Sequence, residues 1–191
     1  MKTDSIIISN DGGGMKEALI QAEKAAVFKE LAKKDALHLR LLTEEMLGMM
    51  RSITGERTGR FWIEDQDGVF RLYLQVHTPM DSAKQERLLA ASKSGKNDAA
   101  KGVMGRIRAF FEPISWTDTP VSMQVDGMQP SMTWSMNAYR QNVKEELEND
   151  REGAAEAWDE LEKSVVSNIA DDVRVSIRGH EVEMVILKKV G

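Results

Sequence analysis

Residues 92–111, SKSGKNDAAKGVMGRIRAFF, place glycines and basic residues before an apolar stretch that predicts a helix over 103–112. Backbone N–H groups at a helix start attract anions, and lysine ammonium groups strengthen that attraction. The stretch is not a Walker A loop, because Ala90 and Asn97 stand where that motif needs Gly and Ser or Thr. A phosphate site and a flexible basic surface loop are both open at this point.

Other residue types with chemical potential are isolated or absent. Gly12–Gly14 follow an apolar run, which favours a turn between a strand and a helix over a phosphate cradle. His38, His77 and His180 have no ligand partner at metal-binding spacing, so no metal site is expected. There are no cysteines, which excludes disulfides, zinc-thiolate sites and cysteine nucleophiles.

The composition is that of one globular domain over residues 1–191. Charged residues make up 30% and hydrophobic residues 41%, and the formal net charge is −5. An acidic chain is not typical of a dedicated nucleic-acid binder, so no nucleic-acid partner is expected. The apolar run in the first 14 residues is too short for a signal peptide or a membrane span, so we expect a cytoplasmic protein without membrane contact.

Hydrophobic periodicity predicts the elements of the first half of the chain. A short strand at Ile6–Ile8 is followed by helices over 15–34 and 35–53, the second with Asp35 as its N-cap. One face of the second helix is apolar, and the opposite face is mixed and includes Glu44 and Gly48. The apolar face consists of Leu39, Leu42, Met46, Met49, Met50 and Ile53.

Three hairpins and further helices are predicted in the rest of the chain. Asp67-Gly68 between apolar runs 61–64 and 69–76 is a strong hairpin signal. Extended pairs are also expected at 121–125 with 132–136 and at 173–177 with 182–187, and helices at 82–91 and 137–168, the latter with a break near Gly153. This order predicts an α+β fold, a two-layer α/β sandwich with a mainly antiparallel sheet and helices on one face.

Four stretches, LRLLTEEMLGMM (39–50), LYLQVHTPMD (72–81), AAKGVMGRIRAFF (99–111) and VRVSIRGHEVEMVILKKV (173–190), carry a resemblance. In this order they resemble the histidine-kinase-like (GHKL) ATPase superfamily, and within it the bacterial anti-sigma-factor serine kinases. The resemblance covers about residues 5–112 and 170–190 and rests on element order and two short motifs. It implies the Bergerat-type ATP-binding fold, with ATP and Mg²⁺ as the ligands.

The resemblance also implies roles for individual residues. Glu44 lies over the family's general base, which activates a water or a serine hydroxyl for attack on the γ-phosphate. Gly48 lies over the asparagine that holds Mg²⁺, and Thr78 over the aspartate that reads adenine. Asp81 is the nearest substitute for that aspartate. Two of the three nucleotide motifs therefore depart from the family pattern.

The third motif is retained. Lys101, Gly102, Met104 and Gly105 lie over the glycine turn that opens the helix under the triphosphate. Residues 92–98 then correspond to the mobile lid, where Lys93, Gly95 and Lys96 lie beside the phosphates. The resemblance thus implies a phosphate site at 101–105.

Residues 113–168 are an insertion relative to the family. This segment contains Trp116, Trp134 and Trp158 and an acidic helix. One interpretation is a surface helix that packs on the sheet through Leu147, Trp158, Leu161 and Val165. The other is an element that binds a partner or forms a dimer. The leading hypothesis is a regulator that binds ATP and a protein partner such as a sigma factor or its regulator. The alternatives are a non-catalytic interaction scaffold and a domain that binds another phosphorylated small ligand.

Overall fold

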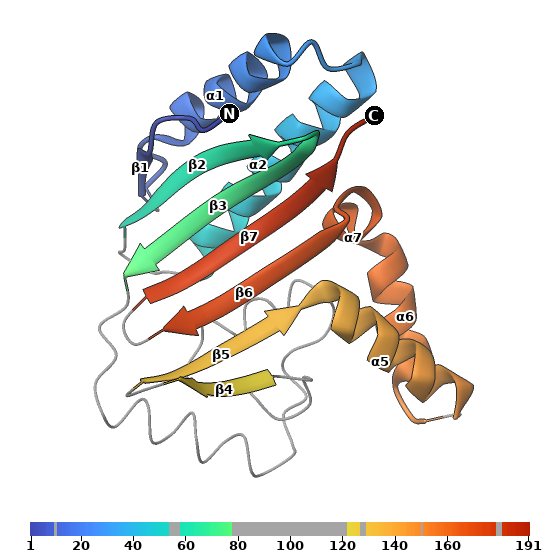
Figure 1. The fold of residues 1–191 in the computed structure, drawn as a ribbon. Helices are drawn as coiled ribbons and strands as arrows, with labels where there is room; N and C mark the ends of the chain where they lie inside the picture. Colours follow the sequence, from blue (N-terminus) through green and yellow to red (C-terminus); the bar gives the residue numbers. More distant parts are fainter. Residues whose placement is uncertain (10, 54–57, 78–121, 127–128, 150, 179–180) are drawn as a thin grey trace. The chain divides into compact units, whose positions relative to one another are not determined.

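The computed structural model describes residues 1–9, 11–53, 58–77, 122–126, 129–149, 151–178 and 181–191 (Figure 1). In this part of the chain, seven strands form a sheet in the order β1-β2-β3-β7-β6-β5-β4. The pairs β1–β2, β2–β3, β4–β5 and β5–β6 are antiparallel. The predicted α+β class and the mainly antiparallel sheet are confirmed.

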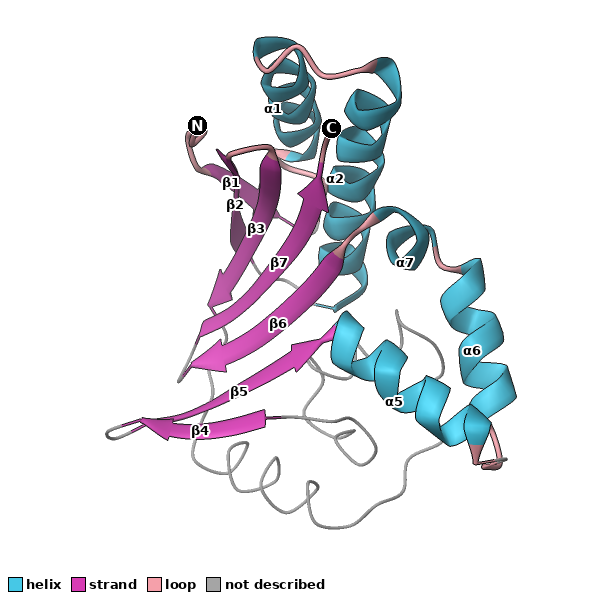
Figure 2. Cartoon of the chain, turned by 45° about the vertical axis from the view of Figure 1, so that its right-hand side comes forward, coloured by secondary structure: helices cyan, strands magenta, loops and turns pink. Residues whose placement is uncertain are grey.

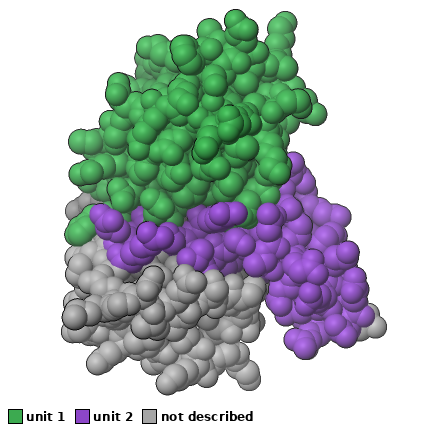
Figure 3. Space-filling model, viewed as in Figure 1, with its two compact units in different colours: residues 1–77, 169–173, 183–191 green, residues 78–168, 174–182 purple. Residues whose placement is uncertain are grey.

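The chain divides into two compact units (Figure 3). Unit 1 consists of residues 1–77, 169–173 and 183–191, and unit 2 of residues 78–168 and 174–182. The expectation of one domain over residues 1–191 stays a prediction.

Unit 1 has helices on one side of its strands. It contains β1 (Ile6–Ser9), α1 (Met15–Phe28), α2 (Lys33–Ile53), β2 (Thr58–Gln66), β3 (Val69–His77) and most of β7 (Glu181–Lys189). Figures 1 and 2 show α1 and α2 side by side on the same face of these strands. An ion pair between Arg40 Nη1 and Glu23 Oε1, 2.9 Å apart, joins the two helices.

The core of unit 1 follows from two periodicities. Along β2 and β3 every second residue is buried, as expected for a sheet with one covered face. Along α2 the buried residues recur at helical spacing, which confirms the predicted apolar face for the residues whose burial is described. The main buried side chains are Leu39, Leu42, Met46, Met49, Phe61, Ile63, Phe70, Leu72, Leu74 and Val76.

The predicted β2–β3 hairpin is confirmed. Its two turn residues, Asp67 and Gly68, have φ values of 52° and 76°. Positive φ at both positions is the type I′ geometry that matches the twist of the flanking strands. The strands extend further than predicted, because the ladder continues to the pair Gln66 and Val69.

The first helix is shorter than the predicted span of 15–34, because α1 ends at Phe28. Glu30 adopts φ 51°. The Glu30 N–H donates to the Val27 carbonyl and the Leu31 N–H to the Ala26 carbonyl, which is the Schellman pattern of a helix end. Since α2 begins at Lys33, Asp35 lies in its first turn and is not the N-cap.

Unit 2 contains β4 (Ser122–Asp126), β5 (Gln129–Ser135), α5 (Met136–Glu148), α6 (Ala154–Lys163) and most of α7 (Val165–Ile169) and β6 (Asp172–Arg178). The Ser135 hydroxyl accepts from the Ala138 N–H at 3.1 Å and starts α5 directly after β5. The predicted break near Gly153 is confirmed, since α5 and α6 are separate helices there. The hairpins β4–β5 and β6–β7 lie where they were expected.

One of the two interpretations of the charged helices is wrong in part. It has Leu147 and Val165 packed on the sheet, but these residues are 38% and 43% exposed. α5 and α6 instead pack on each other, and the buried residues at this end include Tyr139, Val143 and Leu161. Each of these two helices covers part of the apolar surface of the other, so less of that surface has to be covered by the strands.

Candidate functional site

Glu44 and Gly48 lie one turn apart on the solvent side of α2. Both are exposed, while Met46 and Leu47 between them are buried. Residues four apart on a helix share a face and are separated by about 6 Å along its axis. The predicted general base and the predicted metal-site position therefore point to the same side of unit 1.

Gly48 has room for a side chain. A Cβ atom at this position would meet no atom of the described residues within 4 Å, and its backbone has no positive φ. The glycine is therefore not required by packing. A residue with a metal-binding side chain could stand here, and this sequence carries none at the position.

The other predicted ligand residues lie outside the described residues. They all fall between β3 and β4, in residues 78–121, as does Thr78. Figures 1 and 2 show the end of β3, at His77, and the C-terminal half of α2 at the same end of unit 1. The predicted residues concerned are Asp81, Lys93, Gly95, Lys96, Lys101, Gly102, Met104 and Gly105.

The triple glycine forms the expected turn. The Ser9 N–H donates to the Gly13 carbonyl at 3.0 Å, and Gly14 with φ 73° caps the start of α1. The Asp11 carboxylate accepts from the Ser9 hydroxyl and the Gly13 N–H, and these bonds lower the pKa of Asp11 below its usual value. The turn supplies its own anion, which argues against a phosphate cradle here.

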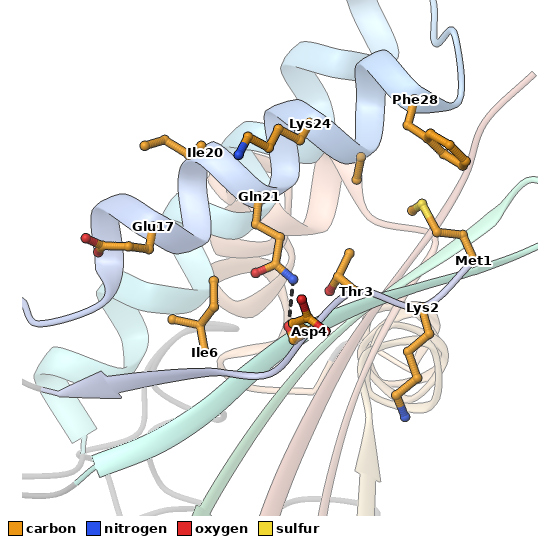
Figure 4. Close-up of a pocket in the computed structure, with 11 residues that line it drawn as sticks. Met1, Lys2, Thr3, Asp4, Ile6, Glu17, Ile20, Gln21, Lys24 and Phe28 are labelled. Carbon is orange, nitrogen blue, oxygen red and sulfur yellow. Dashed lines mark hydrogen bonds between the residues drawn. The ribbon is translucent and has the colours of Figure 1, made fainter.

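A groove between α1 and the first residues of the chain was not predicted from the sequence. Its cavity volume is about 700 Å³, and it is lined by Met1–Asp4, Ile6 and one face of α1 (Figure 4). The α1 face consists of Glu17, Ile20, Gln21, Lys24, Ala25 and Phe28. These positions recur at helical spacing, and that recurrence is the signal that could have indicated the groove.

An ion pair fixes α1 beside this groove. Lys29 Nζ lies 2.6 Å from a carboxylate oxygen of Asp65, whose side chain is 1% exposed. The Met1 ammonium donates to the Asp65 carbonyl at 2.6 Å, and the Asp65 N–H donates to the Met1 carbonyl at 2.8 Å. The end of α1 and the first residue are therefore held to the same residue of β2.

The sheet face of unit 1 that lies opposite the helices carries an aromatic and ionic cluster. Trp62 and Tyr73 are cross-strand neighbours and stack with ring centroids 4.8 Å apart. Lys2 Nζ lies 2.9 Å from Glu64 Oε1 and 5.5 Å from the Trp62 ring centroid. The Lys2 contact, followed by the Trp62 indole bond, lowers the pKa of Glu64, and partial burial is the main cause that raises the pKa of Tyr73.

Metal and membrane features were searched among the described residues. No group of three or more His, Asp or Glu side chains in them is arranged to hold a metal ion. His77 is exposed and His38 is half-buried on α2, while His180 lies outside the described residues. None of the helices in the described ranges is both long enough and apolar enough to span a bilayer.

No protein-family model matches the chain, and comparisons with curated proteins and with solved structures also give no match.

Proposed function

We propose that this protein is a divergent GHKL-type regulatory domain that binds a nucleotide through its phosphates. Glu44 is the acid–base group, and the glycine turn 101–105 holds the phosphates with Lys93 and Lys96. If a phosphoryl group is transferred, the Glu44 carboxylate takes the proton of the attacking water or serine hydroxyl while ADP leaves. A protein partner such as a sigma factor or its regulator is part of the same proposal.

One observation carries the proposal. Glu44 and Gly48 share the exposed face of α2, at the end of unit 1 where the chain leaves β3 toward the predicted phosphate residues. An exposed carboxylate on a rigid helix can approach a reacting phosphate without disturbing the core. The antiparallel sheet with helices on one face is consistent with the fold that the resemblance implies.

The residues present do not fit Mg²⁺ held as the family holds it. Gly48 has no ligand atom in a side chain, so we derive no step from a metal bound at this position. This departure favours a second candidate function, a scaffold that has lost catalysis and acts by binding a protein.

Gly48→Asn tests whether the face of α2 belongs to a nucleotide site. Among the described residues no atom lies near a Cβ at Gly48, and asparagine supplies an oxygen ligand where the family has one. We expect the affinity for ATP to become dependent on Mg²⁺ in this variant, by about 5-fold or more, a coupling of about 1 kcal/mol. Calorimetric titration with and without Mg²⁺ measures the change.

Gly48→Ala is the matched control, because it has the same backbone constraint and no ligand atom. It should bind ATP as the unaltered chain does, while gaining roughly 0.5–1 kcal/mol of stability from helix propensity. If the affinity for ATP depends equally on Mg²⁺ in the Asn and Ala variants, residue 48 is not part of the nucleotide site. Binding of nucleotide without turnover, unchanged in Glu44→Gln, would favour the scaffold.

A further inference from the structure

The groove beside α1 lies along the edge of the sheet. β1 is the terminal strand in the strand order, and residues 1–3 continue this edge because Lys2 is bridged to Glu64. Between the pairs Lys2–Glu64 and Ile6–Phe61, the first strand has three intervening residues and β2 has two. The edge therefore contains a bulge at the groove.

The backbone of Lys2, a residue that lines the groove, has hydrogen-bonding groups that are not bonded to β2. The Met1 carbonyl accepts from the Asp65 N–H and the Thr3 N–H donates to the Ile63 carbonyl at 2.9 Å, so residues 1 and 3 bond to β2. Lys2 and Glu64 are thus a non-hydrogen-bonded pair of an antiparallel ladder, in which the N–H and C=O of Lys2 point away from β2. A further strand would bond to these two groups.

Gln21 adds an acceptor on the opposite wall. Its Nε2 donates to the Asp4 carbonyl at 2.7 Å, which fixes the orientation of the amide (Figure 4). Its Oε1 is buried and has no hydrogen-bond partner among the described residues. A buried acceptor without a partner is costly, and a peptide N–H is the kind of donor that would satisfy it.

The side chains along the α1 wall define the chemistry of an occupant. Glu17 lies at one end and Lys24 nearer the other, about 10 Å apart along the helix axis. Ile20 between them is 38% exposed, and Phe28 beyond Lys24 is 73% exposed. Alternate residues of an extended chain face the same side and span about 13 Å from i to i+4.

We propose that this groove binds an extended peptide segment of a protein partner by strand addition to residues 1–4. The peptide runs antiparallel to the edge and directs a basic, an apolar and an acidic side chain, at i, i+2 and i+4, toward α1. The basic group pairs with Glu17, the apolar group packs on Ile20, and the acidic group pairs with Lys24 while its stem lies against Phe28. This surface does not depend on nucleotide binding.

Titration of the full chain with a capped peptide containing lysine-threonine-isoleucine-threonine-glutamate tests the proposal. We expect this peptide to bind saturably with a Kd below about 1 mM. A second peptide, in which the glutamate is replaced by lysine, should bind about 10-fold more weakly. In Lys24→Glu the preference between the two peptides should reverse. No saturable binding of either peptide, or an unchanged preference in Lys24→Glu, would overturn the proposal.

A pair of exposed apolar residues at the end of α1 supplies a control. Phe28 lines the groove, whereas Val27 is 78% exposed and does not line it. Phe28→Ser should weaken binding about 10-fold, and Val27→Ser should leave it unchanged, with both variants retaining the thermal unfolding of the parent. Equal effects of the two changes would contradict the assigned groove.

A second copy of this chain is the alternative occupant. Sedimentation velocity distinguishes a peptide from a second copy as the occupant. If the groove binds a peptide, Phe28→Ser does not change the oligomeric state. A dimer that Phe28→Ser dissociates, together with no peptide binding, would assign the groove to self-association and overturn the proposal.

Discussion

At the scale of single residues, two glycines of unit 1 have opposite structural requirements. Gly14 has φ 73°, and a Cβ there would lie 2.0 Å from the Ile7 carbonyl oxygen. Gly48 has an ordinary helical backbone, and none of the described residues has an atom within 4 Å of a Cβ built there. The first glycine is needed for the β1–α1 turn, whereas the second is free to be replaced.

Gly14→Ala should therefore destabilise the protein strongly. The left-handed backbone alone costs a side-chain-bearing residue about 1–3 kcal/mol, and the contact with the Ile7 carbonyl adds to that loss. Gly12→Ala is the control, because its φ is 99° but no atom of the described part of the chain lies within 4 Å of the new Cβ. Chemical denaturation should give the larger loss for Gly14, and equal losses would show that the contact is relieved without cost.

The lowered pKa of Glu64 predicts how the stability of the protein depends on pH. Because the Lys2 contact lowers the folded-state pKa, the ion pair stabilises the protein fully above the unfolded pKa of about 4.3 and loses that effect as pH falls through the folded pKa. Lys2→Met should raise the pKa of Glu64, measured by NMR titration of its carboxyl carbon, and flatten the acid side of the stability profile. Lys34→Met, at an exposed residue of α2, should do neither.

At the scale of elements, local signals predicted some boundaries and not others. The Asp67-Gly68 turn was predicted because both residues tolerate positive φ. The end of α1 was missed because a glutamate occupies the left-handed position that glycine usually fills, so no sequence signal interrupts the helical composition of 15–34. The last turn is instead closed by the two backbone bonds to Ala26 and Val27.

Glu30→Gly should stabilise the protein. Glycine adopts φ 51° without the steric cost of a Cβ. This gain exceeds the free-energy cost of ordering the more flexible glycine, so we expect the free energy of unfolding to rise by about 1 kcal/mol. Thermal or chemical unfolding measures the change. A loss of stability would mean that the Glu30 side chain contributes more than its backbone conformation costs.

At the scale of the whole molecule, the sequence predicted the fold class and most elements but only one of the two proposed binding surfaces. The α2 face with Glu44 and Gly48 was predictable because helical periodicity is local. The groove at α1 was not, since its other wall forms through long-range pairing of residues 1–3 with 63–65. The roles of the phosphate residues between β3 and β4 remain the proposal that the resemblance supplies.

Calorimetric titration of the unaltered 191-residue chain with ATP, with and without Mg²⁺, tests the central claim most directly. We predict saturable binding of one nucleotide per chain, with an affinity that Mg²⁺ changes little because Gly48 offers no ligand. Absence of binding at millimolar ATP and ADP would contradict the account of this protein as a nucleotide-binding domain.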